Sequence, residues 1–184
     1  MIREHHQNSI GDRAPDFELP GTDGEVYHLT RYLETQQAVG VIFMSNQCPS
    51  VRSYLARLKQ IQSDFSDRGL LLIGINANDA EQCPEESFAQ MKTFAREHQL
   101  NFPYLRDSSQ DVAHSFGAQI APHVFLLDRA GTIRYCGAID DSPDSPETVQ
   151  HPFLRKAIAA LLDGKDIETT NTEPVGCSLR WRET

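Results

Sequence analysis

Two apolar runs of strand length, residues 38–44 and 70–76, divide the first half of the chain. Runs without polar alternation are typical of strands that are buried on both faces of a sheet. Between these runs, over residues 51–65, apolar residues recur every three or four positions, which predicts an amphipathic helix. Pro49 suits the first position of that helix and Gly69 suits its C-terminal cap.

The second half of the chain alternates helical and extended patterns. Helices are expected over residues 83–99, 108–117 and 151–164, a short strand over 101–107, and a hairpin over 123–137. The resulting order, β-α-β-α-β-α-β-β-α, predicts an α/β domain over residues 1–166 with a central mixed sheet flanked by helices. Turn residues within 11–32 indicate a small N-terminal hairpin, and residues 167–184 are expected to form a tail packed on the domain.

Composition and charge narrow the class of protein. A chain of 184 residues with 39% hydrophobic side chains can form one domain with a proper core. The formal net charge of -9 argues against nucleic acid and anionic membrane surfaces as partners. The first residues lack the apolar segment of a signal peptide, and no run is long enough to span a membrane, so we expect a cytoplasmic protein.

Four cysteines, Cys48, Cys83, Cys136 and Cys177, are too few and too scattered for a disulfide scaffold. Cys48 is distinctive because it lies between a buried strand and a helix start. Free backbone N–H groups at a helix start stabilise a thiolate, and cysteines so placed have pKa values lowered from about 8.5 to roughly 3.5–7.5. Cys48 is therefore the candidate nucleophile; a buried, inert cysteine at a helix start would give the same pattern.

Several longer segments identify a family. The segment "GDRAPDFELPGTDGEVYHL" resembles the N-terminal signature of the alkyl hydroperoxide reductase/thiol-specific antioxidant (AhpC/TSA) family, the redoxin branch of the thioredoxin-like superfamily. The segments "VIFMSNQCPSV", "LLIGINANDAEQCPEESFAQM", "FPYLRDSSQDVAHSFGAQIAPHVFLLD" and "GCSLRW" are similar to a bacterial thioredoxin-like subgroup. The resemblance covers residues 11–181. It implies a thioredoxin-like fold and a thiol-dependent oxidoreductase that uses Cys48, without a metal or an organic cofactor; redoxins also often form homodimers.

The same resemblance gives meaning to the segment "IAPHV". Thioredoxin-like proteins have a cis-proline beside the active cysteine, and Pro122 holds that place. A cis bond there would let Ala121 offer its backbone N–H and C=O to an extended substrate. The residues expected to contact substrate are Asn46, Pro49, Ala121 and His123. Of these, His123 is also a candidate acid or base, with a structural histidine as the alternative.

The chain departs from dithiol reductases at both neighbouring positions. Val51 stands where a Cys-x-x-Cys motif has its second thiol, and Ser45 stands where the similar subgroup often has a cysteine. A thiol that resolves Cys48 must therefore come from elsewhere. Within the family resemblance, Cys177 of the "GCSLRW" motif is the best candidate, Cys83 is a weaker one, and an external thiol of the thioredoxin or glutathione type is the third. Cys136 is expected to be structural.

Two other functions remain open. In a peroxiredoxin-like peroxidase, Ser45 would take the place of the serine or threonine found three residues before the attacking cysteine. Against this interpretation, the chain has Pro122-His123 where peroxiredoxins place an arginine, and Val41 where they have a proline. The second alternative is a non-catalytic module that keeps the groove beside Pro122. The substrate is accordingly a disulfide or a peroxide, and the residues do not distinguish them.

Overall fold

The computed structural model describes residues 8–183, and its centre is a five-stranded mixed sheet with the strand order β5-β4-β3-β7-β8. The strands are β3 (Ala38–Phe43), β4 (Leu70–Asn76), β5 (Tyr104–Arg106), β7 (His123–Asp128) and β8 (Ile133–Gly137). β3 pairs in parallel with β4 and antiparallel with β7. β5 extends the parallel part of the sheet and β8 the antiparallel part. The predicted α/β class with a mixed central sheet is confirmed.

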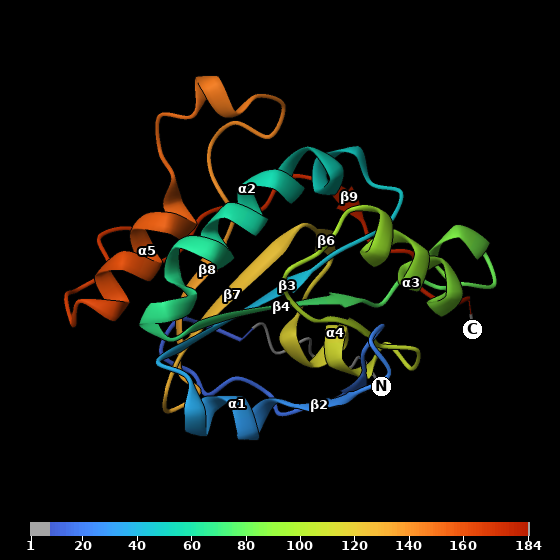
Figure 1. Cartoon of the computed structure of the whole chain (residues 1–184), viewed down its shortest axis with the longest axis horizontal. Helices are drawn as coiled ribbons and strands as arrows, with labels where there is room; N and C mark the ends of the chain where they lie inside the picture. The colour runs from blue at the N-terminus through green and yellow to red at the C-terminus, as the bar shows by residue number, and fades with distance from the viewer. Residues whose placement is uncertain (1–7, 184) are drawn as a thin grey trace, which may run out of the picture.

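Helices cover both faces of this sheet. α2 (Pro49–Phe65) and α5 (Phe153–Leu162) lie side by side on one face, and α1 (Leu29–Thr35) and α4 (Asp111–Phe116) lie on the other (Figure 1). α3 (Phe88–Glu97) packs beside α2, where the Lys59 ammonium donates to the carbonyl oxygen of His98 at 2.8 Å. The helix starting at Pro49 was predicted, whereas α1 was not, because its seven residues are too short for a clear helical period.

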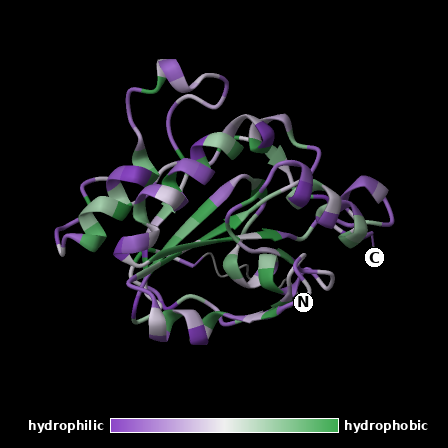
Figure 2. Ribbon diagram, viewed as in Figure 1, coloured by the Kyte–Doolittle hydropathy of each residue, from purple (hydrophilic) through white to green (hydrophobic). Residues whose placement is uncertain are grey.

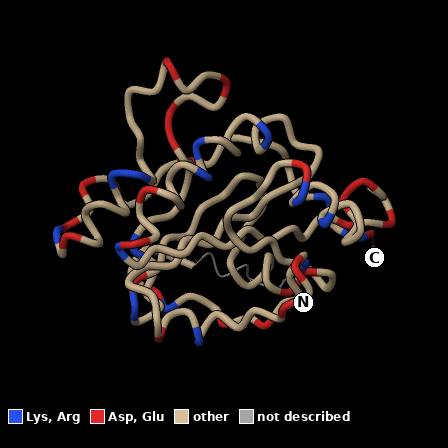
Figure 3. The backbone as a smooth tube through the Cα atoms, in the orientation of Figure 1, with Lys and Arg blue, Asp and Glu red and all other residues tan. Residues whose placement is uncertain are grey.

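The central strands are apolar and the charged residues surround them. Every residue of β3 is buried, which explains why its sequence shows no alternation. Figure 2 shows the most hydrophobic residues concentrated in the strands, and Figure 3 shows the charged residues on the surrounding helices and loops. Phe43, Phe116 and Phe125 form an edge-to-face aromatic cluster that joins α4 to the sheet, with ring centroids 5.1–5.9 Å apart. Burial of each ring contributes roughly 1.5–3 kcal/mol. Within residues 8–183, no helix has the length and apolar character needed to cross a membrane.

Short elements complete the fold and differ in part from the predictions. The N-terminal hairpin is formed by β1 (Glu18–Pro20) and β2 (Val26–His28), as expected. The single helix predicted over residues 83–99 is instead a 3-10 turn, η2 (Pro84–Glu86), followed by α3. Ser87 ends the turn and caps α3, because its hydroxyl accepts a hydrogen bond from the amide of Gln90. Two further 3-10 turns, η1 (Ser66–Arg68) and η3 (Pro146–Thr148), follow α2 and precede α5.

The C-terminal tail is more ordered than its sequence suggests. Its β9 (Cys177–Ser178) forms an antiparallel pair with β6 (Ile120–Ala121), a two-residue strand directly before β7. Figure 1 shows β9 at the same end of the sheet as the start of α2. The pairing therefore brings the end of the chain to the loop that contains Cys48.

Candidate active site

Cys48 lies where β3 has ended and α2 begins. It is the N-cap residue of α2, and Pro49 occupies the first helical position. Both Gln47 and Pro49 are exposed, whereas Cys48 itself is only 3% exposed. The helix start gives the Cys48 sulfur the positive end of a helix dipole, which favours a thiolate over a thiol.

The backbone before Pro122 forms one wall of the site. The Ala121–Pro122 peptide bond is cis, and the carbonyl oxygen of Ala121 lies 3.4 Å from the Cys48 sulfur. Ala121 faces Cys177 across the β6–β9 pair, and the next residue of the tail, Ser178, faces Ile120. The backbone of Ala121, which was expected to bind an extended substrate, is thus paired with the protein's own tail.

Cys48 and Cys177 form a disulfide across 129 residues of sequence, with their Cα atoms 5.9 Å apart. This Cα separation is the common one for protein disulfides. The candidate resolving thiol in the "GCSLRW" segment is therefore held at the candidate nucleophile, and a mechanism that uses Cys48 alone is not confirmed. Cys83 and Cys136 are free thiols.

The tail is attached to the domain on both sides of Cys177. Before it, the Thr172 hydroxyl accepts a hydrogen bond from the amide of Ala138 at 2.9 Å. After it, the amide of Arg180 donates to the side chain of Asn78 at 2.8 Å, and its carbonyl accepts from the amide of Asp79 at 2.8 Å. These contacts do not involve the disulfide, so they attach the tail to the domain independently of that bond.

A buried carboxylate lies beneath the loop before Cys48. Glu86, at the end of η2, is 3% exposed and accepts hydrogen bonds from the Ser45 hydroxyl at 2.5 Å and from the amide of Asn46 at 2.8 Å. Glu86 was not predicted as a site residue, because an acidic residue after Cys83-Pro84 is ordinary in the first turn of a helix. Asn76, at the end of β4, also donates to Glu86 and was not predicted either.

The residues that were predicted near Cys48 differ in their exposure to solvent. Asn46 is 1% exposed, and its side chain accepts from the Tyr104 hydroxyl and donates to the carbonyl of Glu85. Ser45 is also buried, with its hydroxyl hydrogen directed to Glu86. Pro49 is exposed beside Cys48. The structure therefore makes Asn46 and Ser45 supports of the loop.

His123 lies beside Cys136, with its Nε2 3.2 Å from the Cys136 sulfur. Its ring packs on Phe125 with centroids 4.4 Å apart. Both groups line a cavity of about 640 Å³ between the sheet and tail residues 171–174. Burial lowers the pKa of His123 to about 4 and raises the pKa of the Cys136 thiol to about 11. The pair is neutral at physiological pH, which fits a structural role, and no cluster of three metal-binding side chains occurs among the described residues.

The buried imidazole gives the fold an acid sensitivity. The pKa of His123 is about 4 in the folded protein, against 6.5 for a histidine exposed to water, so only the unfolded chain gains this proton between those pH values. Stability from this group is complete above pH 6.5 and is lost as pH falls toward 4, by about 3 kcal/mol in total. We expect His123→Phe to flatten this loss, measured as free energies of urea unfolding from pH 7 to pH 4.

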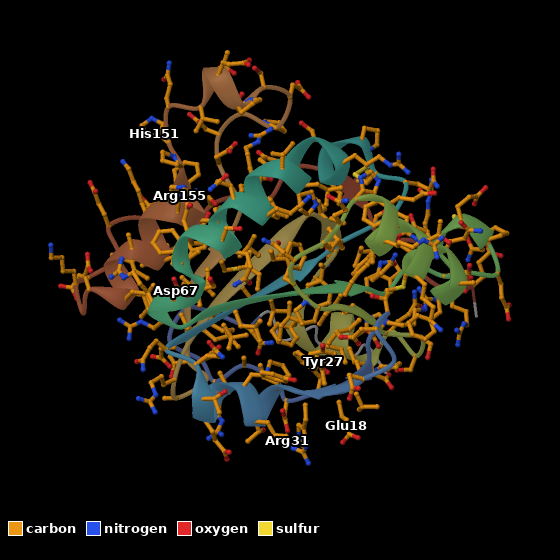
Figure 4. All side chains as sticks on the ribbon, viewed as in Figure 1. Glu18, Tyr27, Arg31, Asp67, His151 and Arg155 are labelled. Carbon is orange, nitrogen blue, oxygen red and sulfur yellow. A yellow bond between two sulfur atoms is a disulfide. The ribbon has the colours of Figure 1, made fainter. Side chains whose placement is uncertain are left out.

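His151 provides the matched control for this measurement. It is exposed in the loop before α5, where Figure 4 labels it at the edge of the molecule. His151→Gln should keep the wild-type loss of stability toward pH 4, apart from the small contribution of its charge interaction with the exposed Asp141. If the free energy of unfolding falls equally steeply with pH in His123→Phe and in the wild-type protein, the prediction is wrong.

Comparison with known proteins places this site in a family. The model of the AhpC/TSA family matches residues 10–136, so the chain belongs to that family. Thiol-disulfide oxidoreductase ResA of Geobacillus thermodenitrificans is 22% identical over 68% of this chain and 67% of its own length. "Putative peroxiredoxin MT2597" of Mycobacterium tuberculosis is 25% identical over 71% of this chain and 78% of its own length.

A solved structure covers the tail as well. The crystal structure of a hypothetical protein from Sinorhizobium meliloti 1021 is 36% identical, with a TM-score of 0.89, and the match covers 96% of this chain and 97% of the other. The fold is thioredoxin-like, because thioredoxin-family and peroxidoxin structures also match it with TM-scores of 0.64–0.68. Family and relatives together support a role as a thiol oxidoreductase.

Proposed function

We propose that this protein is a thiol-disulfide oxidoreductase that cycles between two thiols and the Cys48–Cys177 disulfide. The observation that carries the proposal is the position of Cys177. A tail strand paired to Ala121, beside the cis-proline, brings its thiol to a cysteine that begins a helix. The relationship to ResA supports disulfide chemistry, since that protein is named for it. The proposed partners are a disulfide substrate and an external thiol reductant of the thioredoxin or glutathione type.

The proposed cycle has three exchange steps, each of which conserves one disulfide. In the first, the Cys48 thiolate attacks the substrate disulfide, forms a mixed disulfide and releases one substrate thiolate. In the second, the Cys177 thiolate attacks the Cys48 sulfur, closes the internal disulfide and releases the other half of the substrate. In the third, an external dithiol, or two molecules of a monothiol such as glutathione, reduces the internal disulfide and becomes oxidised itself. The substrate reaches Cys48 when the short β6–β9 pairing opens.

The geometry distinguishes the two sulfurs in the third step. A thiolate attacks a disulfide sulfur from the side opposite the leaving sulfur, and access and leaving-group pKa decide which sulfur reacts. Cys48 is 3% exposed, with Ala121 against it, whereas Cys177 is half-buried between exposed neighbours Gly176 and Ser178. Attack at Cys177 also releases Cys48 as a thiolate at a helix start. We therefore expect the reductant to bond first to Cys177.

Mass spectrometry tests this proposal. The free thiols Cys83 and Cys136 of the oxidised protein are first blocked with N-ethylmaleimide under mild denaturation, and the protein is refolded. Reduced glutathione is then added briefly, and an isotopically heavy maleimide is added as the quench. Glutathione on Cys177 and heavy label on Cys48 is the expected pattern. Glutathione on Cys48 would contradict the assignment of roles, and the absence of any release from the disulfide would contradict the function.

A peroxiredoxin-like peroxidase is the second candidate. It is supported by the peroxiredoxin relative and by Ser45, which lies three residues before Cys48. In that case the Cys48 thiolate would attack a peroxide oxygen, become a sulfenic acid, and condense with Cys177 to the same disulfide with loss of water. Second-order rate constants of the reduced protein with hydrogen peroxide and with a disulfide separate the two candidates. A third candidate, the non-catalytic module, requires that Cys48 alkylate no faster than free cysteine at neutral pH.

A further inference from the structure

Glu86 is the most extensively bonded side chain beneath the site. Its Oε1 accepts from the Ser45 hydroxyl at 2.5 Å and from the amide of Gln47 at 3.1 Å. Its Oε2 accepts from the amide of Asn46 at 2.8 Å and from the side-chain amide of Asn76 at 2.7 Å. None of these four donors is a cation. The carboxylate is thus held by the loop before Cys48 and by the end of β4, and it fixes the position of that loop.

The carboxylate also fixes the direction of the Ser45 hydroxyl. A hydroxyl has one hydrogen to donate, and the Ser45 hydroxyl donates it to Oε1 of Glu86. The Ser45 oxygen then presents its lone pairs to the loop, where it accepts from the amide of Cys48 at 3.1 Å and from that of Gln47 at 3.2 Å. Both the Ser45 hydroxyl and the Cys48 amide are therefore withheld from atoms that react at Cys48.

The loss of these two hydrogen-bond donors slows attack on a peroxide more than attack on a disulfide. When a thiolate attacks hydrogen peroxide, it forms a sulfenic acid and expels hydroxide, the anion of water, whose pKa is about 15.7. When it attacks a disulfide, it forms a new disulfide and expels a thiolate, whose parent thiol has a pKa of about 8.5. Hydroxide is much the poorer leaving group, so its departure depends more strongly on hydrogen-bond donors aimed at the leaving oxygen.

We propose that Glu86 is a positioning residue that sets the substrate preference of Cys48: by holding the Ser45 hydrogen, it favours disulfides over peroxides. The inference rests on the proposed role of Cys48 as the nucleophile. Glu86 does not touch the reacting sulfur; it acts through Ser45. The peroxide reactivity that the spacing of Ser45 suggests is suppressed by a residue from a different segment of the chain.

Glu86→Gln reverses the polarity of this contact. With its oxygen toward Asn46 and Asn76, the new amide donates to Ser45 and no longer accepts from the amide of Gln47, which still donates to the Ser45 oxygen. The Ser45 hydrogen is then free for Cys48 or a leaving oxygen. Reduced protein is mixed with hydrogen peroxide or with oxidised glutathione over a range of pH, and the plateau rate constants at high pH are compared, because there Cys48 is fully ionised in every variant. We expect the peroxide-to-disulfide ratio to rise about tenfold.

Controls isolate the contribution of Ser45. Glu85→Gln removes an exposed neighbouring charge and should keep the wild-type ratio. The double variant Ser45→Ala/Glu86→Gln should lose the gain. An unchanged ratio in folded Glu86→Gln, or a gain that persists without Ser45, would overturn the proposal.

Ser45→Ala tests the proposal even if Glu86→Gln fails to fold. Since the Ser45 hydrogen is assigned to Glu86, its loss should not lower the peroxide rate constant. A tenfold fall would show that Ser45 donates to the reacting atoms and would overturn the inference. Cys48→Ser separates this failure from failure of the proposed function. If that variant keeps its disulfide reactivity, the function is wrong; if it loses both reactions, only the role of Glu86 is in question.

Discussion

Replacement of Cys48 by serine is expected to abolish turnover of a disulfide substrate, with kcat/KM falling by about 10³-fold or more. A serine hydroxyl is not ionised at neutral pH, and a helix start that stabilises a thiolate does not make it a comparable nucleophile. Cys48 is also one half of the internal disulfide, so the same change removes the oxidised form of the site. Release of a coloured thiolate from an aromatic disulfide, with dithiothreitol as the final reductant, measures the loss.

The remaining cysteines give matched controls for this loss. Without dithiothreitol, Cys177→Ser should retain the first release of thiolate and then stop at a mixed disulfide on Cys48, which intact-protein mass spectrometry detects. Cys83→Ser changes a free thiol at another helical start and should keep wild-type turnover. Residual turnover above a few per cent in Cys48→Ser, or loss of activity in Cys83→Ser, would assign the chemistry to another thiol.

The position of Cys48 between a strand and a helix was predictable because its signals are local. A buried apolar strand, a cysteine, a proline and a helical period follow one another within residues 38–65, and each sets the structure of its own segment. The strands and most helices of the domain follow from the same periodicity. The break of the predicted helix at Ser87 was harder to find, since the residues on both sides of it favour helix and only the hydroxyl cap marks the end.

The surroundings of Cys48 were less predictable because they depend on contacts between distant segments. The hydrogen bond from Ser45 to Glu86 joins residues 41 positions apart, and nothing in the sequence near Glu86 indicates this partner. The tail gave only one signal, the likeness of "GCSLRW" to a family segment. Its two-residue pairing with Ala121 is too short to show a strand pattern. The pairing of His123 with Cys136 likewise follows from strand register and not from either residue's own segment.

The close approach of the tail makes Gly176 the second position with a large expected effect. Gly176 precedes Cys177, and a methyl group in place of its hydrogen would overlap the carbonyl oxygen of Ala121 and approach the Pro122 ring. Both obstacles belong to the wall of the site and not to a flexible side-chain end. Gly176→Ala must therefore displace the tail from β6 and move the Cys177 sulfur away from Cys48.

A displacement of this kind is expected to slow closure of the internal disulfide by about 100-fold, because a shift of about 1 Å at reacting atoms costs a rate factor of that order. Attack of Cys48 on the substrate should be retained, since Cys48 and α2 are untouched. Stopped-flow measurement of the two successive thiolate releases from an aromatic disulfide separates these steps. The first release should keep at least its wild-type rate, and the second should lag.

Ser178→Ala is the matched control, because Ser178 lies in the same short strand with an exposed side chain. It should close the disulfide at the wild-type rate. If Gly176→Ala also closes at that rate, the β6–β9 pairing does not set the distance between the two thiols. In that case contacts outside the β6–β9 pairing, such as those of Thr172 and Arg180, hold the tail, and Cys177 reaches Cys48 from a range of positions.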